Sequence, residues 1–268
     1  MAVPMEDNFA DVVNKAQRGL GMADRELAQR AGIPVEALHR VKGERYDAAA
    51  LRKIAPLLGL NAEALASLPE YCPVPVQVAG LAAFTTAYGG AGVNSYLVLD
   101  AASGEAAAFD TGMDCGPMLE MVRAKNLKLR EIFLTHTHGD HTADLARLQS
   151  ETGARIYVSE RESLRGAESF EAGRAFTCGR LRITTRSTWG HSRGGATYVI
   201  DGLERPVAVV GDALFAGSMG GGMFSYADAL RTNREEIFTL PPETVLCPGH
   251  GPLTTVAWER AHNPFFAE

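Results

Sequence analysis

The sequence predicts an α/β protein with two unequal domains: a small all-α domain over residues 1–70 and a larger α/β domain over residues 71–268. Apolar residues of the first recur at helical spacing, whereas the second has β-prone runs that end at glycine or proline. Between them, Tyr71–Pro75 contains two prolines, which exclude a helix and stiffen the connection. Hydrophobic residues make up 46% of the 268 residues, which is enough for a substantial core.

The sequence of the first domain predicts short helices joined by turns that contain glycine. Residues 24–31 have high helix propensity, and Gly32 ends that helix. Pro34 fits the first turn of a second helix, which we expect to run to about Val41 and to end before Gly43. Two short helices with such a turn form a helix-turn-helix pattern.

A further helix is predicted over residues 51–58, where apolar residues recur at i, i+3, i+4 and i+7. The whole segment resembles Cro/repressor-type DNA-binding domains. The resemblance rests on Leu27, Ala28, Ala31, Gly32, Ile33, Gly43, Leu51, Ile54, Ala55, Leu58, Gly59 and Leu60.

The charge of this domain argues against specific DNA binding. Residues 1–70 contain nine lysines and arginines against ten acidic residues, whereas DNA affinity depends on a basic face that releases counter-ions. The helix in the position of a recognition helix begins Pro34-Val35-Glu36-Ala37, which offers little to read base edges. A small candidate DNA-contacting face remains, formed by His39, Arg40, Lys42 and Arg45. We expect instead a helical module that forms a homodimer or covers a site in the second domain.

The sequence of the second domain predicts a β-rich region that begins near residue 76, followed by alternating strands and helices. Residues 117–129 favour a helix, and residues 131–134 form a short apolar strand. Residues 147–155 favour the next helix and turn.

A cluster of metal-ligand residue types follows that short strand, in the sequence Leu-Thr-His-Thr-His-Gly-Asp-His-Thr over residues 134–142. His136 and His138 face the same way if the chain is extended there, because side chains in a strand repeat every two residues. Asp140 and His141 lie where the chain turns and are directed to a neighbouring point. The cluster can therefore serve two ions a few ångströms apart.

Three further ligand candidates stand alone in the second half of the chain: His191, Asp212 and His250. Each follows an apolar or β-prone run and is flanked by glycine or proline. Such a pattern is typical of side chains that loops present at the ends of strands.

The order His-x-His-x-Asp-His, then His, Asp and His, resembles the metallo-β-lactamase superfamily, and within it short glyoxalase II-like hydrolases. The resemblance covers about residues 75–268. Its further motifs are Asn94–Val98, Asp110–Gly112, Gly211–Ser218, Pro248–Pro252 and Thr254–Phe265. It implies an αββα sandwich of two face-to-face sheets with helices outside and a site at one end.

The resemblance also implies the ligand sets. His136, His138 and His191 would hold a first metal, Asp140, His141 and His250 a second, and Asp212 would bridge both. Imidazole and carboxylate donors suit zinc, our first expectation, and also iron or manganese. Two divalent ions about 3.5–4 Å apart can lower the pKa of a shared water toward about 7. We therefore expect a hydrolase whose nucleophile is metal-bound hydroxide, with Asp140 and Asp212 as catalytic residues and Asp140 aiming that hydroxide.

The substrate is a small molecule that the sequence defines only by class, as a thioester, ester or lactone. Glyoxalase II-like enzymes commonly carry arginine where Gly221 stands and Gly-Gly where Ala143-Asp144 stand. Arg193, two residues after His191, is a candidate for binding a substrate carboxylate, with a structural salt bridge as the alternative.

Two other functions stay open. A persulfide dioxygenase would resemble this fold but use one iron bound by two histidines and an aspartate. A metabolite-responsive regulator would bind a ligand at the metal domain and DNA through the helical domain.

The sequence favours a cytoplasmic protein. The N-terminus has neither a basic start nor an apolar stretch, so we expect no secretory signal and no membrane span. The four cysteines show no C-x-x-C spacing and are expected to be reduced thiols.

Overall fold

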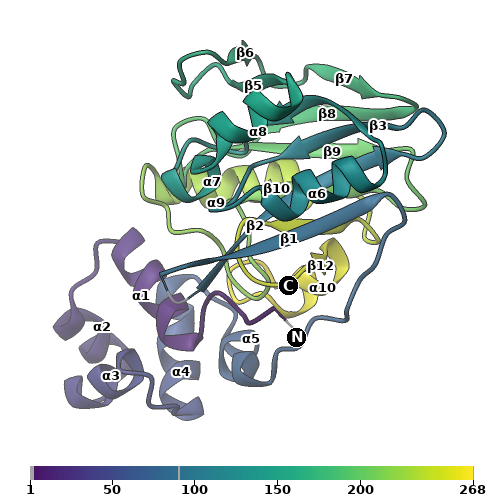
Figure 1. The fold of residues 1–268 in the computed structure, drawn as a ribbon. Helices are drawn as coiled ribbons and strands as arrows, with labels where there is room; N and C mark the ends of the chain where they lie inside the picture. The colour runs from purple at the N-terminus through teal and green to yellow at the C-terminus, as the bar shows by residue number, and fades with distance from the viewer. Residues whose placement is uncertain (1–2, 90, 268) are drawn as a thin grey trace.

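The computed structural model describes residues 3–267 apart from residue 90, and this part of the chain contains two six-stranded sheets (Figure 1). The first sheet has the order β1 (Leu81–Tyr88), β2 (Ala91–Asp100), β3 (Glu105–Phe109), β4 (Lys128–Phe133), β5 (Arg155–Ser159) and β6 (Glu168–Phe170). The second has the order β12 (Thr254–Thr255), β11 (Val245–Pro248), β10 (Val207–Gly211), β9 (Ala196–Asp201), β8 (Leu181–Ser187) and β7 (Ala175–Cys178).

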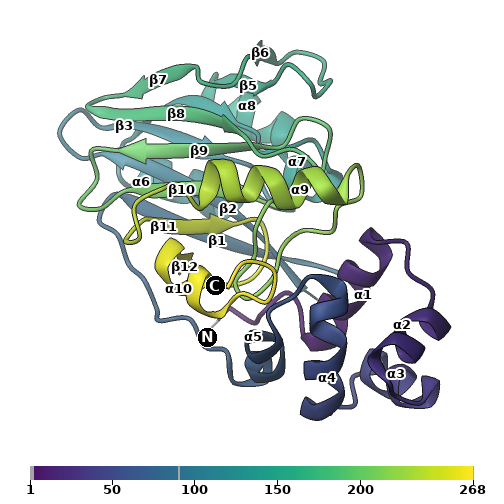
Figure 2. The same ribbon diagram turned by 180° about the vertical axis from the view of Figure 1, so that it is seen from behind.

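The sheets pack face to face, and helices cover both outer faces. Side chains of both sheets meet in one apolar cluster that includes Phe109, Phe133, Tyr198, Val209 and Cys247. Helices α6 (Gly116–Ala124) and α8 (Leu145–Thr152) pack on the first sheet. Helices α9 (Tyr226–Thr232) and α10 (Val256–His262) lie over the second sheet (Figure 2). The expected order of layers, helix–sheet–sheet–helix, is present.

Strand β10 is apolar throughout and buried along its whole length. Val207 and Val209 point into the cluster between the sheets, whereas Ala208 and Val210 belong to the cluster on the outer face. Because both faces are covered, the strand needs no polar alternation.

The first seventy residues form helices, as predicted. They are α1 (Phe9–Gly19), α2 (Asp24–Ala31), α3 (Val35–Lys42), α4 (Ala48–Ile54), η1 (Ala55–Leu58), α5 (Ala62–Ser67) and η2 (Leu68–Glu70). Gly32 ends α2 in the left-handed conformation, with φ +62°, which glycine adopts without steric cost. Pro34 is the N-cap of α3.

Two predicted helices differ in extent. The helix expected over residues 51–58 is α4 up to Ile54 and then the tighter turn η1, because Pro56 has no N–H for an α-helical hydrogen bond. The helix expected over residues 117–129 ends at Ala124. Asn126 then adopts a positive φ of 49° and β4 begins at Lys128.

The helical region shares its core with the sandwich. One continuous apolar cluster joins side chains of α1–α5, such as Val13 and Leu65, to Val210 of β10 and to Phe265 near the C-terminus. The Asn61 backbone N–H also donates to the Pro264 carbonyl at 2.7 Å. Helices α1–α5, at lower left in Figure 1, therefore share an apolar core with the outer layer of the second sheet.

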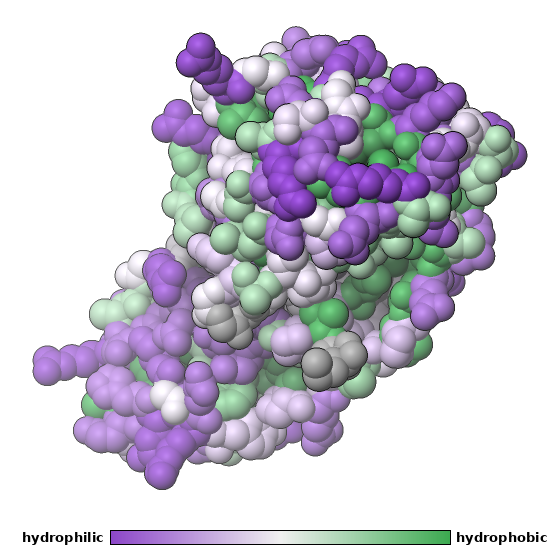
Figure 3. All heavy atoms as spheres, viewed as in Figure 1, coloured by the Kyte–Doolittle hydropathy of each residue, from purple (hydrophilic) through white to green (hydrophobic). Residues whose placement is uncertain are grey.

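In the described residues, no helix is both long and apolar enough to cross a bilayer. On the face in Figure 3, hydrophilic side chains predominate over the helical region at lower left.

Candidate metal centre

Loops that follow the strands bring the predicted ligands together at one end of the sandwich. The cluster from His136 to His141 follows β4, and its last residues form the short helix α7 (Gly139–Thr142), at the left of the sandwich in Figure 1. His191 follows β8, Asp212 follows β10, and His250 follows β11. Each of these strands is hydrogen-bonded within a sheet, so each loop starts from a rigid point.

The first group consists of His136, His138, His191 and Asp212, whose ligand atoms lie within 4.8 Å of one another. Nδ1 of His138 is 2.9 Å from Nε2 of His136 and 3.1 Å from Nε2 of His191. Oδ2 of Asp212 lies 3.3 Å from Nε2 of His191. Three imidazoles and one carboxylate therefore surround one point.

The second group consists of Asp140, His141 and His250, again within 4.8 Å of one another. Oδ2 of Asp140 is 3.2 Å from Nε2 of His250. Asp212 reaches this group as well, because its Oδ1 lies 3.3 Å from Nε2 of His141. The carboxylate of Asp212 thus lies between the two groups.

Hydrogen bonds behind three of the histidines fix their ring orientation. Nδ1 of His141 is 2.8 Å from an Asp110 oxygen, whereas Nδ1 of His191 and Nδ1 of His250 lie 2.9 Å from the carbonyls of Gly221 and Gly92. Each ring therefore directs Nε2 into the cluster. Metal-ligating histidines are held by such outer partners in proteins generally.

Asp110 is a further site residue, which the sequence indicated only as part of the motif Asp110–Gly112. Besides His141, it accepts hydrogen bonds from the backbone N–H and the hydroxyl of Thr135, at 2.8 and 2.7 Å. Its φ is +56°, which costs a non-glycine residue energy and is seen where surroundings enforce it. The Asp-Thr-Gly sequence directly after β3 was the available signal.

Burial and mutual charge set the protonation of the cluster. Burial lowers the pKa of His136 well below 6.5, which keeps it in the neutral form that binds metals. Burial also favours a lower pKa for His141, but the carboxylates of Asp212 and Asp110 have the larger effect and raise the pKa of His141 well above 6.5. Burial opposes ionisation of Asp212, yet the surrounding histidines hold its pKa well below 3.8.

The residues fit a divalent metal. Nε2 of His141 and Oδ1 of Asp212 are buried and make no hydrogen bond among the described residues, although such atoms are normally paired. Both point into the cluster, where a cation would satisfy them. The donors are imidazole nitrogens and carboxylate oxygens without thiolate, a set that zinc, iron and manganese accept.

Two glycines allow the loops to approach this closely. A Cβ on Gly220 would overlap the carbonyl oxygen of Asp212, and one on Gly249 would overlap the Asp212 carboxylate and the His141 ring. Larger residues at either position would displace Asp212.

The N-terminal segment also reaches the centre, which the sequence did not indicate. The Glu6 carboxylate lies 3.7 Å from Nδ1 of His250. Nζ of Lys15, on α1, donates to the Met219 carbonyl at 3.0 Å and lies over the ring of Phe215, which packs edge-on against His250. The helical region thus forms part of the wall around the second group.

Arg193 and the candidate DNA-contacting residues lie outside the cluster. The Arg193 side chain is exposed and lies over the Phe224 ring, 5.1 Å from its centroid. On α3, Lys42 and His39 both bind the Asp24 carboxylate, at 2.6 and 3.1 Å. Arg40 and Arg45 are exposed.

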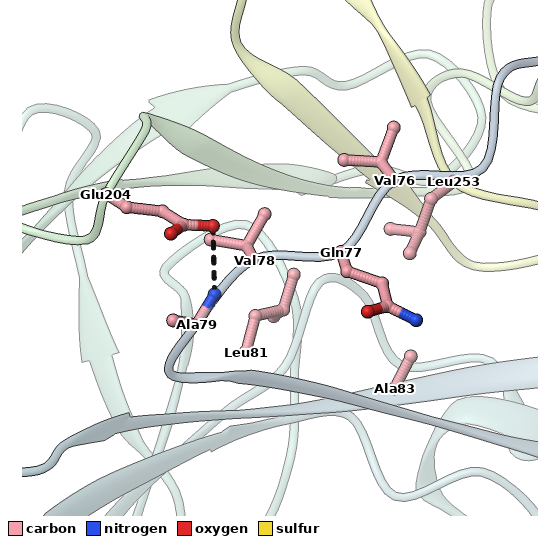
Figure 4. Close-up of a pocket in the computed structure, with 8 residues that line it drawn as sticks. All are labelled: Val76, Gln77, Val78, Ala79, Leu81, Ala83, Glu204 and Leu253. Carbon is pink, nitrogen blue, oxygen red and sulfur yellow. Dashed lines mark hydrogen bonds between the residues drawn. The ribbon is translucent and has the colours of Figure 1, made fainter.

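A cavity of about 580 Å³ lies elsewhere, between residues 76–79 and β1 (Figure 4). Apolar side chains such as Val78, Leu81 and Leu253 line it, and Glu204 accepts a hydrogen bond from the Ala79 N–H at its edge. It shares no residue with the metal-ligand groups.

Known relatives match the part of the chain that carries the cluster. The sequence profile of the Metallo-beta-lactamase superfamily matches residues 88–250. A probable metallo-hydrolase of Streptococcus pyogenes is 32% identical over 66% of this chain and 86% of the relative. A hydroxyacylglutathione hydrolase of Cereibacter sphaeroides is 30% identical over 58% of this chain and 61% of its own length. The mitochondrial persulfide dioxygenase ETHE1 of Homo sapiens is 29% identical over 63% of this chain and 70% of its length.

A solved structure gives the same assignment. The B3 metallo-beta-lactamase BLEG-1 superposes with a TM-score of 0.61 at 26% identity, over 70% of this chain and all of that one. The profile match spans more than half of the chain and includes its metal-ligand groups from His136 to His250. The chain belongs to the metallo-beta-lactamase superfamily.

Proposed function

We propose that this protein is a dinuclear metal-dependent hydrolase of a thioester or related acyl compound. His136, His138 and His191 would hold one ion, and Asp140, His141 and His250 the other, with Asp212 bridging. We propose zinc as the resident metal, with iron and manganese as alternatives.

The position of Asp212 is the observation that carries this proposal. Its two oxygens each lie 3.3 Å from a histidine Nε2, one in the first group and one in the second. One carboxylate shared in this way joins two ligand sets into a single centre. A single ion at the first group would leave Nε2 of His141 buried and, among the described residues, without a hydrogen bond.

Two divalent ions held there would activate a water at neutral pH and polarise the acyl carbonyl of a substrate. The chain's own residues supply the orientation. Asp140 belongs to the second group, and its side chain is 11% exposed, so it can also accept a hydrogen bond from the attacking water. Asp110 holds the His141 ring from behind.

The hydrolytic reaction is supported by relatives named as metallo-hydrolase and hydroxyacylglutathione hydrolase. Purified protein should therefore be assayed with a panel of thioesters, esters and lactones. Turnover of a thioester without oxygen uptake is the expected result. Failure on the whole panel by fully metal-loaded protein would contradict the proposal.

A mononuclear-iron persulfide dioxygenase is the second candidate, because one relative bears that name at 29% identity. It predicts one iron per chain and oxygen consumption with glutathione persulfide. An oxygen electrode distinguishes it from hydrolysis directly.

A further inference from the structure

Two arginines lie on adjacent loops beside the metal centre. Arg161 follows β5, and Arg193 stands two residues after His191. The loops touch, since a Cβ on Gly194 would lie 2.9 Å from the Arg161 carbonyl carbon. The Gly194 N–H also donates to Oε1 of Glu162 at 2.9 Å, so a hydrogen bond joins the loops as well.

Each guanidinium stacks on an aromatic ring, and the two rings are neighbours. Arg161 lies 4.3 Å from the centroid of Trp189, and Arg193 lies 5.1 Å from that of Phe224. The ring centroids of Trp189 and Phe224 are 6.0 Å apart. Stacking of this kind fixes the plane of a guanidinium and leaves its N–H edge free to bind a planar anion.

This four-residue group, Arg161–Trp189–Phe224–Arg193, is tied to the first metal-ligand group. The Phe224 N–H donates to the carbonyl of Gly190, directly before His191, at 3.0 Å. The same loop provides the Gly221 carbonyl that lies 2.9 Å from Nδ1 of His191. The rings on which the two arginines stack therefore belong to loops that contact the backbone on either side of His191.

Nearby carboxylates are engaged elsewhere. Glu162 accepts hydrogen bonds from Thr137 and from the Gly194 backbone. Asp228 is bound by Ser225 and forms an ion pair with Arg231. Within the described residues, neither Arg161 nor Arg193 forms an ion pair. The N–H groups of both guanidinium groups therefore stay available to an anionic ligand, although the carboxylates of Glu162 and Asp228 lie near them.

We propose that Arg161 and Arg193 bind an anionic group of the substrate, a carboxylate or a phosphate, beside His191. This inference rests on the proposed acyl hydrolysis and narrows its substrate class. The scissile carbonyl would lie at the metals, and the anion would lie on the side of the Trp189 and Phe224 rings. Neutral acyl compounds would then be poor substrates.

Two matched substrate pairs test this on the metal-loaded, full-length protein. The first pair is S-acetyl-3-mercaptopropionate and its neutral amide, S-acetyl-3-mercaptopropionamide. The second is S-acetyl-4′-phosphopantetheine and S-acetylpantetheine. We expect kcat/KM to be about tenfold higher for the anion of at least one pair, because charge-assisted hydrogen bonds to the arginines stabilise the bound anion even after solvent screening.

The double variant Arg161→Met/Arg193→Met should reduce that preference to about twofold or less. Arg174→Met is the matched control, because Arg174 also lies over aromatic rings, Tyr157 and Phe176, in another part of the fold. It should keep the preference. Raising the ionic strength should shrink the preference of the wild type, since salt screens exposed charges.

Binding is measured independently by ligand-observed NMR with the thioether 3-(methylsulfanyl)propionate, which cannot be hydrolysed as a thioester. Binding that the double variant loses and Arg174→Met keeps supports the anion site even if no thioester is turned over, a result that would contradict only the proposed function. Equal kcat/KM within both pairs, with thioesters hydrolysed, would overturn the inference and leave the proposed function standing. A preference confined to the second pair supports the inference with phosphate as the group bound.

Discussion

The Glu6 carboxylate lies 3.7 Å from Nδ1 of His250, so the N-terminal segment meets the metal centre directly. The same nitrogen is 2.9 Å from the Gly92 carbonyl. A carboxylate behind a ligating histidine makes the ring a stronger electron donor and fixes its orientation.

Glu6→Gln should therefore weaken binding of the metal held by His250, by about three- to tenfold, which is less than a direct outer hydrogen bond would contribute. Competition with a chelator measures this affinity. Glu36→Gln, on the exposed face of α3, is the matched control and should bind metal like the wild type. Equal metal affinities for the wild type and both variants would show that Glu6 does not contribute to metal binding.

The two ligand groups should respond differently to substitution. His138→Ala removes a ligand from the first group alone and should leave about one ion per chain. Asp212→Ala removes the shared carboxylate and should lower occupancy of both sites. Both variants should lose hydrolysis while circular dichroism shows an intact fold, because these side chains lie on loops. Full activity of either variant would contradict the assigned ligands.

Metal affinity should fall as the pH is lowered. In the metal-free protein, Asp212 and Asp110 raise the pKa of His141 well above 6.5 despite its burial, so its imidazole carries a proton near neutrality. A metal must displace that proton, and the affinity therefore falls by up to about tenfold per pH unit for each proton displaced. Proton release on metal addition, followed with an indicator dye in weak buffer, checks this. No release at pH 7 would show that His141 is already neutral.

Removal of residues 1–70 should make the remaining chain insoluble or inactive. The truncation uncovers the apolar cluster that α1–α5 share with β10 and removes Glu6 and Lys15 from the centre. A milder test is Leu65→Ala at a fully buried position, which should lower the free energy of unfolding by about 2–5 kcal/mol. Leu20→Ala, at a half-exposed position, is the control. A truncated chain that stays soluble, active and unchanged in oligomeric state would disprove this role.

DNA binding by the helical region should be weak and indifferent to sequence. Lys42 and His39, two of the four candidate contacts, already bind Asp24, and the region has a net negative charge. Gel-shift assays with the gene's own upstream region should show no specific complex at about 150 mM salt. At that salt concentration a small number of phosphate contacts gives only weak DNA affinity. Specific nanomolar binding there would favour the metabolite-responsive regulator.

Features encoded locally could be predicted from the sequence. The cluster from His136 to His141 is a compact pattern, and His191, Asp212 and His250 each follow an apolar or β-prone run that forms a strand. Helix α2 also has the predicted bounds, because Gly32 stops it.

Features that depend on distant contacts could not be predicted. Glu6 and His250 come from opposite ends of the chain, and nothing near either residue indicates their contact. The stacking of Arg161 on Trp189 likewise depends on two loops that only the sandwich brings together.

Metal stoichiometry tests the central claim most directly. Elemental analysis of the purified full-length chain, after loading with zinc, iron or manganese and removal of excess metal, counts the ions that the centre retains. The shared position of Asp212 predicts about two ions per chain, and about one in His138→Ala. No retained metal, or a single iron with the second group empty under all loading conditions, would contradict a dinuclear centre.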